Sequence, residues 1–286
     1  MGPLDGRAVI ALHPIILPDL TDHDLRLLHH LGLRLIWPLR HGQLAPADPE
    51  LSEAEMIAHS NAALDLVTQT YCKGPVPILS FAASSKLALA YARHRPGRVE
   101  AIFFAAACDV EGRPVAGARR LARGMMTLGG SDEGLQIAVA AHFTERVLKS
   151  GEFMAFLRAQ FAGSPADQAV VEAELAAPRL GRRMQDALVG SLRSVRHDFQ
   201  FQRDLGWDQL PKGNADLHFI HGSEDVIHPF ALIAARVARI PGATLHRIEG
   251  AGQLLYGPHF APLLDIVAGL LAGRSRPGNA REGAAG

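Results

Sequence analysis

The chain has 286 residues, of which 48% are hydrophobic and 20% are charged. A chain of this length and composition can bury about three quarters of its unfolded surface in one globular core. It carries 29 basic and 29 acidic residues, so its formal charge at neutral pH is zero. This balance gives no electrostatic footprint for nucleic acid or an anionic membrane, and neither is expected as a partner.

The first twenty residues contain an apolar stretch that polar residues and prolines interrupt, namely His13, Pro14, Pro18 and Asp19. The stretch is therefore too broken for a signal peptide or a membrane helix, and a cytoplasmic location is expected. For a protein in that compartment, Cys72 and Cys108 are expected to be free thiols.

Short apolar runs alternate along the chain with longer helical patterns. This alternation is typical of a parallel sheet that helices cover on both faces. The runs predict strands at 8–13, 33–38, 76–81, 99–106, 216–221 and 243–249. Helices are predicted at about 21–31, 52–71, 84–94, 229–239 and 259–272, with Thr21 and Ser52 as N-caps.

The strand signal disappears for about a hundred residues in the middle of the chain, and a helical pattern replaces it. A stretch of this length is far too long for an ordinary connection within an α/β core. The sequence therefore predicts a core formed by 1–107 and 214–272, with a helical cap inserted at 108–213. The residues 273–286 have no apolar periodicity, and we expect them to be a disordered tail.

Three segments resemble the α/β-hydrolase family in the order in which that family has them. The segment VPILSFAASSKLALAYARHRPGRV resembles its strand, G-x-S-x-G nucleophile elbow and following helix, which places Ala82 at the tip of the elbow. HGSEDVIHP is similar to the segment with the catalytic acid, which matches Asp225. IPGATLHRIEGAGQLL is similar to the segment with the catalytic histidine, and Gln253 stands at that position.

This resemblance implies the α/β-hydrolase fold, with a mostly parallel sheet flanked by helices and an inserted helical cap. Within 108–213, AGSPADQAVVE and VRHDFQFQRDLGW also resemble hydrolase-like modules of bacterial helix-turn-helix regulators. The first strand leads into LHPII, which is similar to the family's loop that helps to form the oxyanion hole.

The residues at the matched positions cannot support acyl transfer by the family's chemistry. That chemistry needs a nucleophile, an imidazole that takes its proton and an acid that orients the imidazole. Ala82 offers a methyl group and Gln253 cannot exchange a proton near neutral pH, so Asp225 remains alone. The oxyanion hole would use the backbone N–H of Ala83, whereas Pro14 has no N–H to add.

The resemblance therefore favours a non-catalytic binding or sensor protein that encloses a small hydrophobic molecule between core and cap. No cofactor or metal is implied, and a homodimer is compatible with the sequence. The residues expected to line the ligand site, in addition to the three matched positions, are His13, Ile15, Phe81, Ala83, Asp109 and Ile227.

Two alternatives stay open at this point. The protein could be a lyase, cyclase or isomerase that uses Asp225, Asp109 or His13 without a covalent step. It could also be an esterase-like hydrolase with a displaced nucleophile, for which the candidates are Ser80, Ser84 and Ser85.

The matched positions also lead to two geometric expectations. Ala82 should lie on a sharp strand-to-helix turn with a φ angle above zero or close to it, because the turn belongs to the fold and not to the serine side chain. Asp225 and Gln253 should lie within hydrogen-bond reach of one another, directly or through one water, at the carboxyl edge of the sheet.

Overall fold

A computed structural model describes residues 1–13, 20–38, 53–107, 158, 161–176 and 215–274. Its centre is a sheet of six parallel strands in the order β2-β1-β3-β4-β5-β6. The strands are β1 (Arg7–Leu12), β2 (Leu33–Ile36), β3 (Val76–Phe81), β4 (Val99–Ala105), β5 (Asp216–Gly222) and β6 (Ala243–Ile248). All six were predicted, and the architecture confirms the predicted parallel sheet.

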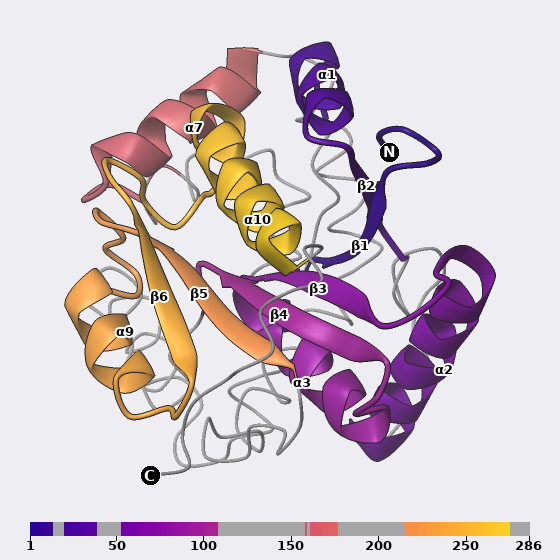
Figure 1. The fold of residues 1–286 in the computed structure, drawn as a ribbon. Coiled ribbons are helices and arrows are strands. Elements are labelled where there is room, and N and C mark those ends of the chain that lie inside the picture. The colour runs from indigo at the N-terminus through magenta and orange to yellow at the C-terminus, as the bar shows by residue number, and fades with distance from the viewer. Residues whose placement is uncertain (14–19, 39–52, 108–157, 159–160, 177–214, 275–286) are drawn as a thin grey trace, which may run out of the picture.

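Helices cover both faces of this sheet (Figure 1). Their bounds are α1 (Asp22–His30), α2 (Glu53–Tyr71), α3 (Ser85–His94), α7 (Pro165–Ala176), α9 (Phe230–Val237) and α10 (Phe260–Arg274), with short 3-10 turns η1 (Ala82–Ser84) and η3 (Gly257–His259). Apolar side chains of α2, α3 and α9 pack on one face, and those of α1 and α10 pack on the other.

The burial of each strand follows its place in the sheet. Every residue of the inner strand β3 is buried, because helices cover both of its faces. A strand in this position reads as a continuous apolar run, which is why VPILSF was recognisable in the sequence. The edge strand β6 has only Ile248 buried.

Thr21 is the N-cap of helix α1, as predicted, and it forms a capping box with Asp24. The Thr21 hydroxyl accepts a hydrogen bond from the backbone N–H of Asp24 at 3.2 Å, and the Asp24 carboxylate accepts one from the backbone N–H of Thr21 at 2.8 Å. The reciprocal bonds satisfy two backbone donors that a helix start leaves free. The other predicted N-cap, Ser52, lies outside the described residues.

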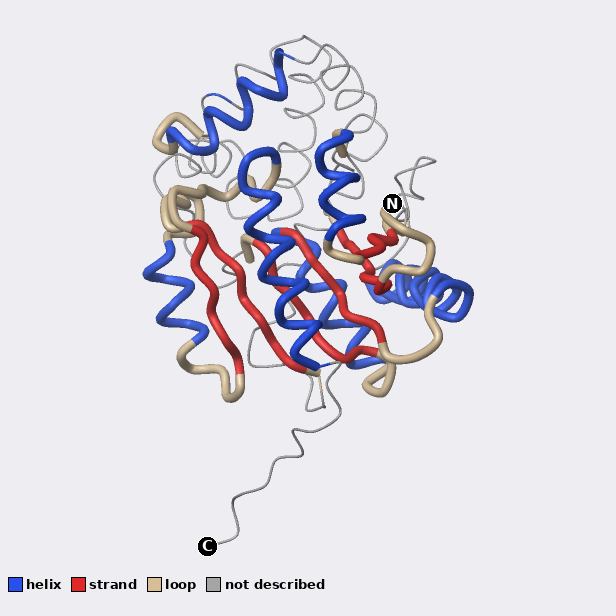
Figure 2. The backbone as a smooth tube through the Cα atoms, turned by 45° about the horizontal axis from the view of Figure 1, so that its top comes forward, coloured by secondary structure: helices blue, strands red, loops and turns tan. Residues whose placement is uncertain are grey.

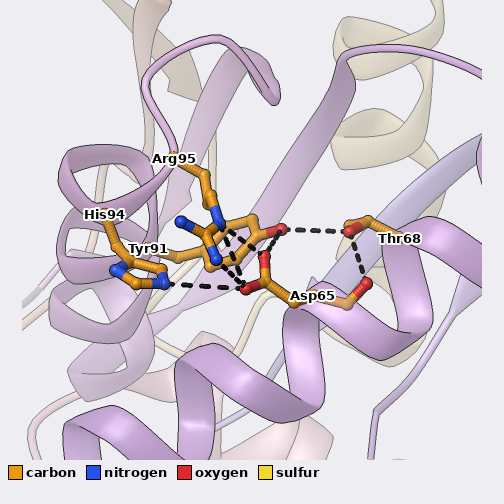
Figure 3. A network of polar contacts seen from close by, with 5 residues as sticks. All are labelled: Asp65, Thr68, Tyr91, His94 and Arg95. Carbon is orange, nitrogen blue, oxygen red and sulfur yellow. Dashed lines mark hydrogen bonds and ion pairs between the residues drawn. The ribbon is translucent and has the colours of Figure 1, made fainter.

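A polar network joins α2 to α3 (Figure 3). The Asp65 carboxylate accepts hydrogen bonds from the Arg95 guanidinium at 2.7 to 3.1 Å and from the Tyr91 hydroxyl at 3.1 Å. The Tyr91 hydroxyl also lies 3.0 Å from that of Thr68. Arg95 is the main reason that the pKa of Asp65 lies below its ordinary value. The network holds α3 against α2, so it fixes the helix that follows the predicted elbow.

The structure corrects the predicted start of the tail and describes only part of the predicted insertion. The disordered tail was predicted to begin at residue 273, but α10 continues through Gly273 to Arg274, where Leu270, Leu271 and Ala272 extend its apolar pattern. Most of the predicted insertion at 108–213 lies outside the described residues, but α7 falls within the insertion and is described.

Cys72 is a free thiol, whereas Cys108 is not described. Among the helices described, none has the length and apolarity that crossing a membrane requires.

His218 and His246, on neighbouring strands, predict a loss of stability in mild acid. Their ring nitrogens lie 3.4 Å apart, and burial, followed by the charge of His246, lowers the pKa of His218 from 6.5 to about 4. The unfolded chain therefore binds a proton before the folded chain does as the pH falls. Stability should be complete above about pH 7 and decline between about pH 6.5 and 4, by about 3 kcal/mol in total.

Urea unfolding at a series of pH values measures this decline. The variant His218→Phe should show a flatter dependence than the wild type between pH 7 and 4.5. Equal slopes for the wild type and His218→Phe would show that His218 is not the group responsible.

Candidate functional site

The loops that follow the parallel strands meet at one edge of the sheet, where their carboxyl ends lie together. In an open parallel sheet this edge is where ligands bind. Ala82 follows β3, Asp225 follows β5 and Gln253 follows β6. Figure 2 shows α7 beyond this edge, next to the loop that follows β6. The fold thus brings the three matched positions to the same edge, as we expected.

Ala82 occupies a sharp turn between β3 and α3. Its φ angle is 46°, whereas Phe81 before it is extended and Ser85 after η1 is helical. This finding confirms the predicted backbone conformation. Ala106, just after the neighbouring strand β4, has a φ of 50°. Left-handed backbone is unfavourable for residues with a Cβ, so strain gathers at this edge of the sheet.

The strain at Ala82 predicts that Ala82→Gly stabilises the protein. A left-handed residue with a Cβ costs about 1 to 2 kcal/mol, and glycine removes most of that cost while adding about 0.4 to 1 kcal/mol of unfolded-state entropy. The expected net gain is about 0.5 to 1 kcal/mol, measured by urea unfolding. The matched variant Ala58→Gly, at an exposed position in α2, should instead lose about 1 kcal/mol. A loss of stability in Ala82→Gly as well would show that the turn is not strained.

The three serines around the turn are buried, and their hydroxyls contact backbone carbonyls. The Ser84 hydroxyl donates to the carbonyls of Leu12 and Phe81 at 2.7 Å, and the Ser85 hydroxyl donates to the carbonyl of Ala82 at 2.7 Å. Ser84 is the N-cap residue of α3, but its hydroxyl accepts no capping hydrogen bond from the backbone. Ser80 and Ser84 are 0% exposed and Ser85 is 3% exposed.

Asp225 braces its own loop. Its Oδ1 accepts hydrogen bonds from the backbone N–H groups of Ile227 and His228, both at 2.8 Å, and its Oδ2 lies 3.1 Å from Nε2 of His221. The side chains of Asp225 and His221 are almost completely buried. The His221 Nε2 also lies 2.6 Å from the carbonyl oxygen of His228. These contacts tie the strand end to the loop, which suits a structural role for His221.

Asp225 and Gln253 were predicted to lie within hydrogen-bond reach of one another, directly or through one water. Among the described residues no direct hydrogen bond joins the two side chains, and the water-mediated contact stays a prediction. The Gln253 side-chain oxygen is buried without a hydrogen-bond partner. The two shortest hydrogen bonds to Asp225 come from backbone N–H groups of its own loop.

A residue that the sequence did not single out, Asp167 of α7, contacts the loop of Gln253. Its carboxylate oxygens accept the backbone N–H groups of Gln253 at 3.0 Å and Leu254 at 2.7 Å. Asp167 is 0% exposed, and burial is the main cause that raises its pKa. The N-cap pattern of Ser164 and Pro165 did signal a helix start, but nothing local in the sequence signals a contact with residue 253.

Four aromatic rings gather around Phe81, the residue before Ala82, on the α10 side of the sheet. This aromatic cluster consists of His13, Trp37, Phe81 and Tyr256. The ring of Phe81 stacks on Tyr256 at 4.9 Å and on Trp37 at 6.1 Å, and that of His13 is tilted against all three at 5.5 to 6.3 Å. His13 and Phe81 were predicted as ligand-site residues, whereas Trp37 and Tyr256 were not.

Comparison with known proteins identifies the architecture. No family model matches the sequence, and no curated protein matches it. Solved structures do match across nearly the whole chain. An α/β-hydrolase enzyme from a Medee basin deep-sea metagenome library aligns over 97% of this chain and 93% of its own, with a TM-score of 0.64 and 12% identity. The chain has the α/β-hydrolase fold.

Two further structures with this fold come from bacteria. An esterase from Rhodococcus sp. ECU1013 aligns over 94% of this chain and 92% of its own, with a TM-score of 0.62 and 17% identity. A meta-cleavage product hydrolase from Pseudomonas fluorescens IP01 aligns over 95% and 92%, with a TM-score of 0.58 and 16% identity. At these identities the likeness extends to the fold and no further.

The remaining predicted residues of the α/β-hydrolase-fold site are placed only in part. Ile15, Asp109 and the oxyanion-loop Pro14 lie outside the described residues. Ala83 lies in η1, beside Ala82, and Ile227 is half-buried in the loop that Asp225 braces. Within the described ranges, no three side chains of the metal-ligating types gather into a group that could hold an ion.

Proposed function

We propose that this α/β-hydrolase-fold protein binds a small hydrophobic molecule at the carboxyl edge of its sheet and does not hydrolyse it. The observation that carries the proposal is the turn at Ala82, which keeps the strained φ of 46° although it presents only a methyl group. Strained backbone persists where the surrounding structure holds it, commonly at a functional site. A strained site without a nucleophile suits binding rather than acyl transfer.

The contacts around the turn support the loss of hydrolysis. The three serine candidates for a displaced nucleophile are buried, and the hydroxyls of Ser84 and Ser85 donate to backbone carbonyls at 2.7 Å. The Gln253 side-chain amide does not take up a proton near neutral pH, so it cannot act as the general base. The carboxylate of Asp225 braces its own loop.

The aromatic cluster supports a hydrophobic ligand. The ring of Phe81, the residue before Ala82, stacks on that of Tyr256, and sites for small molecules are lined mainly by apolar and aromatic side chains. Burial also raises the pKa of Tyr256 well above its ordinary value, so its hydroxyl stays neutral. Tyr256 therefore contributes no charge to the proposed site.

A thermal-shift screen with small aromatic and aliphatic compounds tests the proposal. A compound present at 100 times its dissociation constant should stabilise the protein by about 2.7 kcal/mol. Tyr256→Ala should abolish most of this gain, whereas Tyr71→Ala, at an exposed position of α2, should keep it. If no compound stabilises the wild type, or if both variants respond as the wild type does, the proposed site is wrong.

A further inference from the structure

The loop that carries Gln253 is fastened from two sides. On one side, the backbone N–H of Glu224 donates to the carbonyl of Ala251 at 2.8 Å, and that of Ser223 donates to the carbonyl of Ile248 at 3.0 Å. On the other side lies the carboxylate of Asp167. The first set holds the beginning of the loop, so the part with Gln253 itself depends on Asp167.

The Asp167 carboxylate is built into this position. Its own backbone N–H donates to the Ser164 hydroxyl at 3.1 Å, which places Asp167 in the first turn of α7. The positive end of the helix dipole and the Ser164 hydroxyl both favour the ionised carboxylate. Hydrogen bonds from backbone N–H groups to an ionised carboxylate are about twice as strong as those between neutral groups.

Gly252 shows how closely the loop and the carboxylate meet. A Cβ added to Gly252 would lie 2.1 Å from Oδ2 of Asp167 and 2.5 Å from Oδ1. No side chain fits between the two, so the backbone reaches the carboxylate only because residue 252 is glycine. The charge on Asp225 adds to the pKa rise of Asp167, so a second carboxylate is near enough to act on it.

We propose that Asp167 is the positioning residue for Gln253, a role that the resemblance would give to Asp225. Asp167 holds the loop by its backbone, whereas Asp225 holds only its own loop. The segment 161–176 and the loop of Gln253 then form one unit, held by the two hydrogen bonds to the Asp167 carboxylate. The consequence for ligand affinity rests on the proposed function, but the positioning does not.

Hydrogen exchange of single backbone amides, measured by NMR on the full chain without ligand, separates the two roles. Asp167→Asn loses one of the two acceptors, so exchange at Gln253 and Leu254 should become about 10- to 100-fold faster. Asp225→Asn should accelerate the amides of Ile227 and His228 instead and leave 253 and 254 unchanged. The matched control is Glu172→Gln, an exposed acid on the same helix that pairs with Arg158, and it should change neither pair.

The crossed pattern is what a merely structural role for Asp167 would not produce, since general loosening would accelerate both pairs. Unchanged exchange at Gln253 and Leu254 in Asp167→Asn, or acceleration of those amides by Asp225→Asn, would overturn the proposal. If Asp167→Asn does not fold, Gly252→Ala provides the same test, because the added methyl group displaces the carboxylate. It should accelerate the same two amides, and their continued protection would count against the proposal.

If the ligand screen finds nothing, the exchange pattern still decides the positioning role of Asp167. If a compound does bind, Asp167→Asn should weaken its affinity more than Glu172→Gln does. The failure of the proposed function and the failure of this inference are therefore distinguishable.

Discussion

The wild-type protein should hydrolyse p-nitrophenyl esters no faster than background and should not react with a serine-directed fluorophosphonate probe. The turn at Ala82 supplies the position of a nucleophile but no hydroxyl. Loss of the nucleophile from such a site costs about 10⁶-fold in rate, and the members of a triad act as a unit. Either single change, Ala82→Ser or Gln253→His, should therefore restore little.

The double variant Ala82→Ser with Gln253→His should gain probe labelling relative to both single variants. Its matched control is Ala83→Ser with Gln253→His, which moves the new hydroxyl away from the left-handed turn and should remain unlabelled. Turnover in the active double variant should stay low, because the contact of Asp225 Oδ2 with His221 competes with the new imidazole. Labelling of the unmodified protein at Ser80, Ser84 or Ser85, mapped by peptide mass spectrometry, would instead establish a displaced nucleophile.

Gly222→Ala should be the most destabilising of the small substitutions, by about 3 kcal/mol or more. A Cβ on Gly222 would lie 2.2 Å from the carbonyl oxygen of Gly252 and 2.3 Å from that of Ala251. Both obstacles are backbone atoms, so no side chain can turn aside to make room. The loop of Gln253 would have to move away from β5, and urea unfolding measures the cost.

The control for this prediction is Gly269→Ala. Gly269 is exposed within α10, and an added Cβ would meet nothing within 4 Å. Alanine is the better helix former by about 1 kcal/mol, so this substitution should stabilise the protein. If the free energies of unfolding of the two variants differ by less than about 1 kcal/mol, the close packing of Gly222 against the loop of Gln253 does not determine the stability.

The sheet could be predicted from the sequence because its signals are local. Buried parallel strands read as short apolar runs, and the register through the elbow segment also predicted the positive φ of Ala82. The N-cap at Thr21 could be predicted for the same reason, since an N-cap residue and its backbone partner are three residues apart.

The site could be predicted only in part, because its contacts join residues that are distant in the chain. Asp167 and Gln253 are separated by 86 positions, and no periodicity or motif links them. The expected contact between Asp225 and Gln253, direct or through one water, also joins two distant loops, and its water-mediated form stays a prediction. The amides of Ile227 and His228, which lie two and three residues from Asp225, bind its Oδ1.

The most direct test of non-hydrolytic binding is the fate of a bound compound. Any compound that stabilises the wild type, but not Tyr256→Ala, is incubated with the protein for many hours, and the mixture is then analysed by mass spectrometry. The account predicts that the compound is recovered in its full added amount, with its mass and its structure unchanged. Conversion to a product by the wild type, abolished in Tyr256→Ala, would contradict the account and show that the site is an enzyme's.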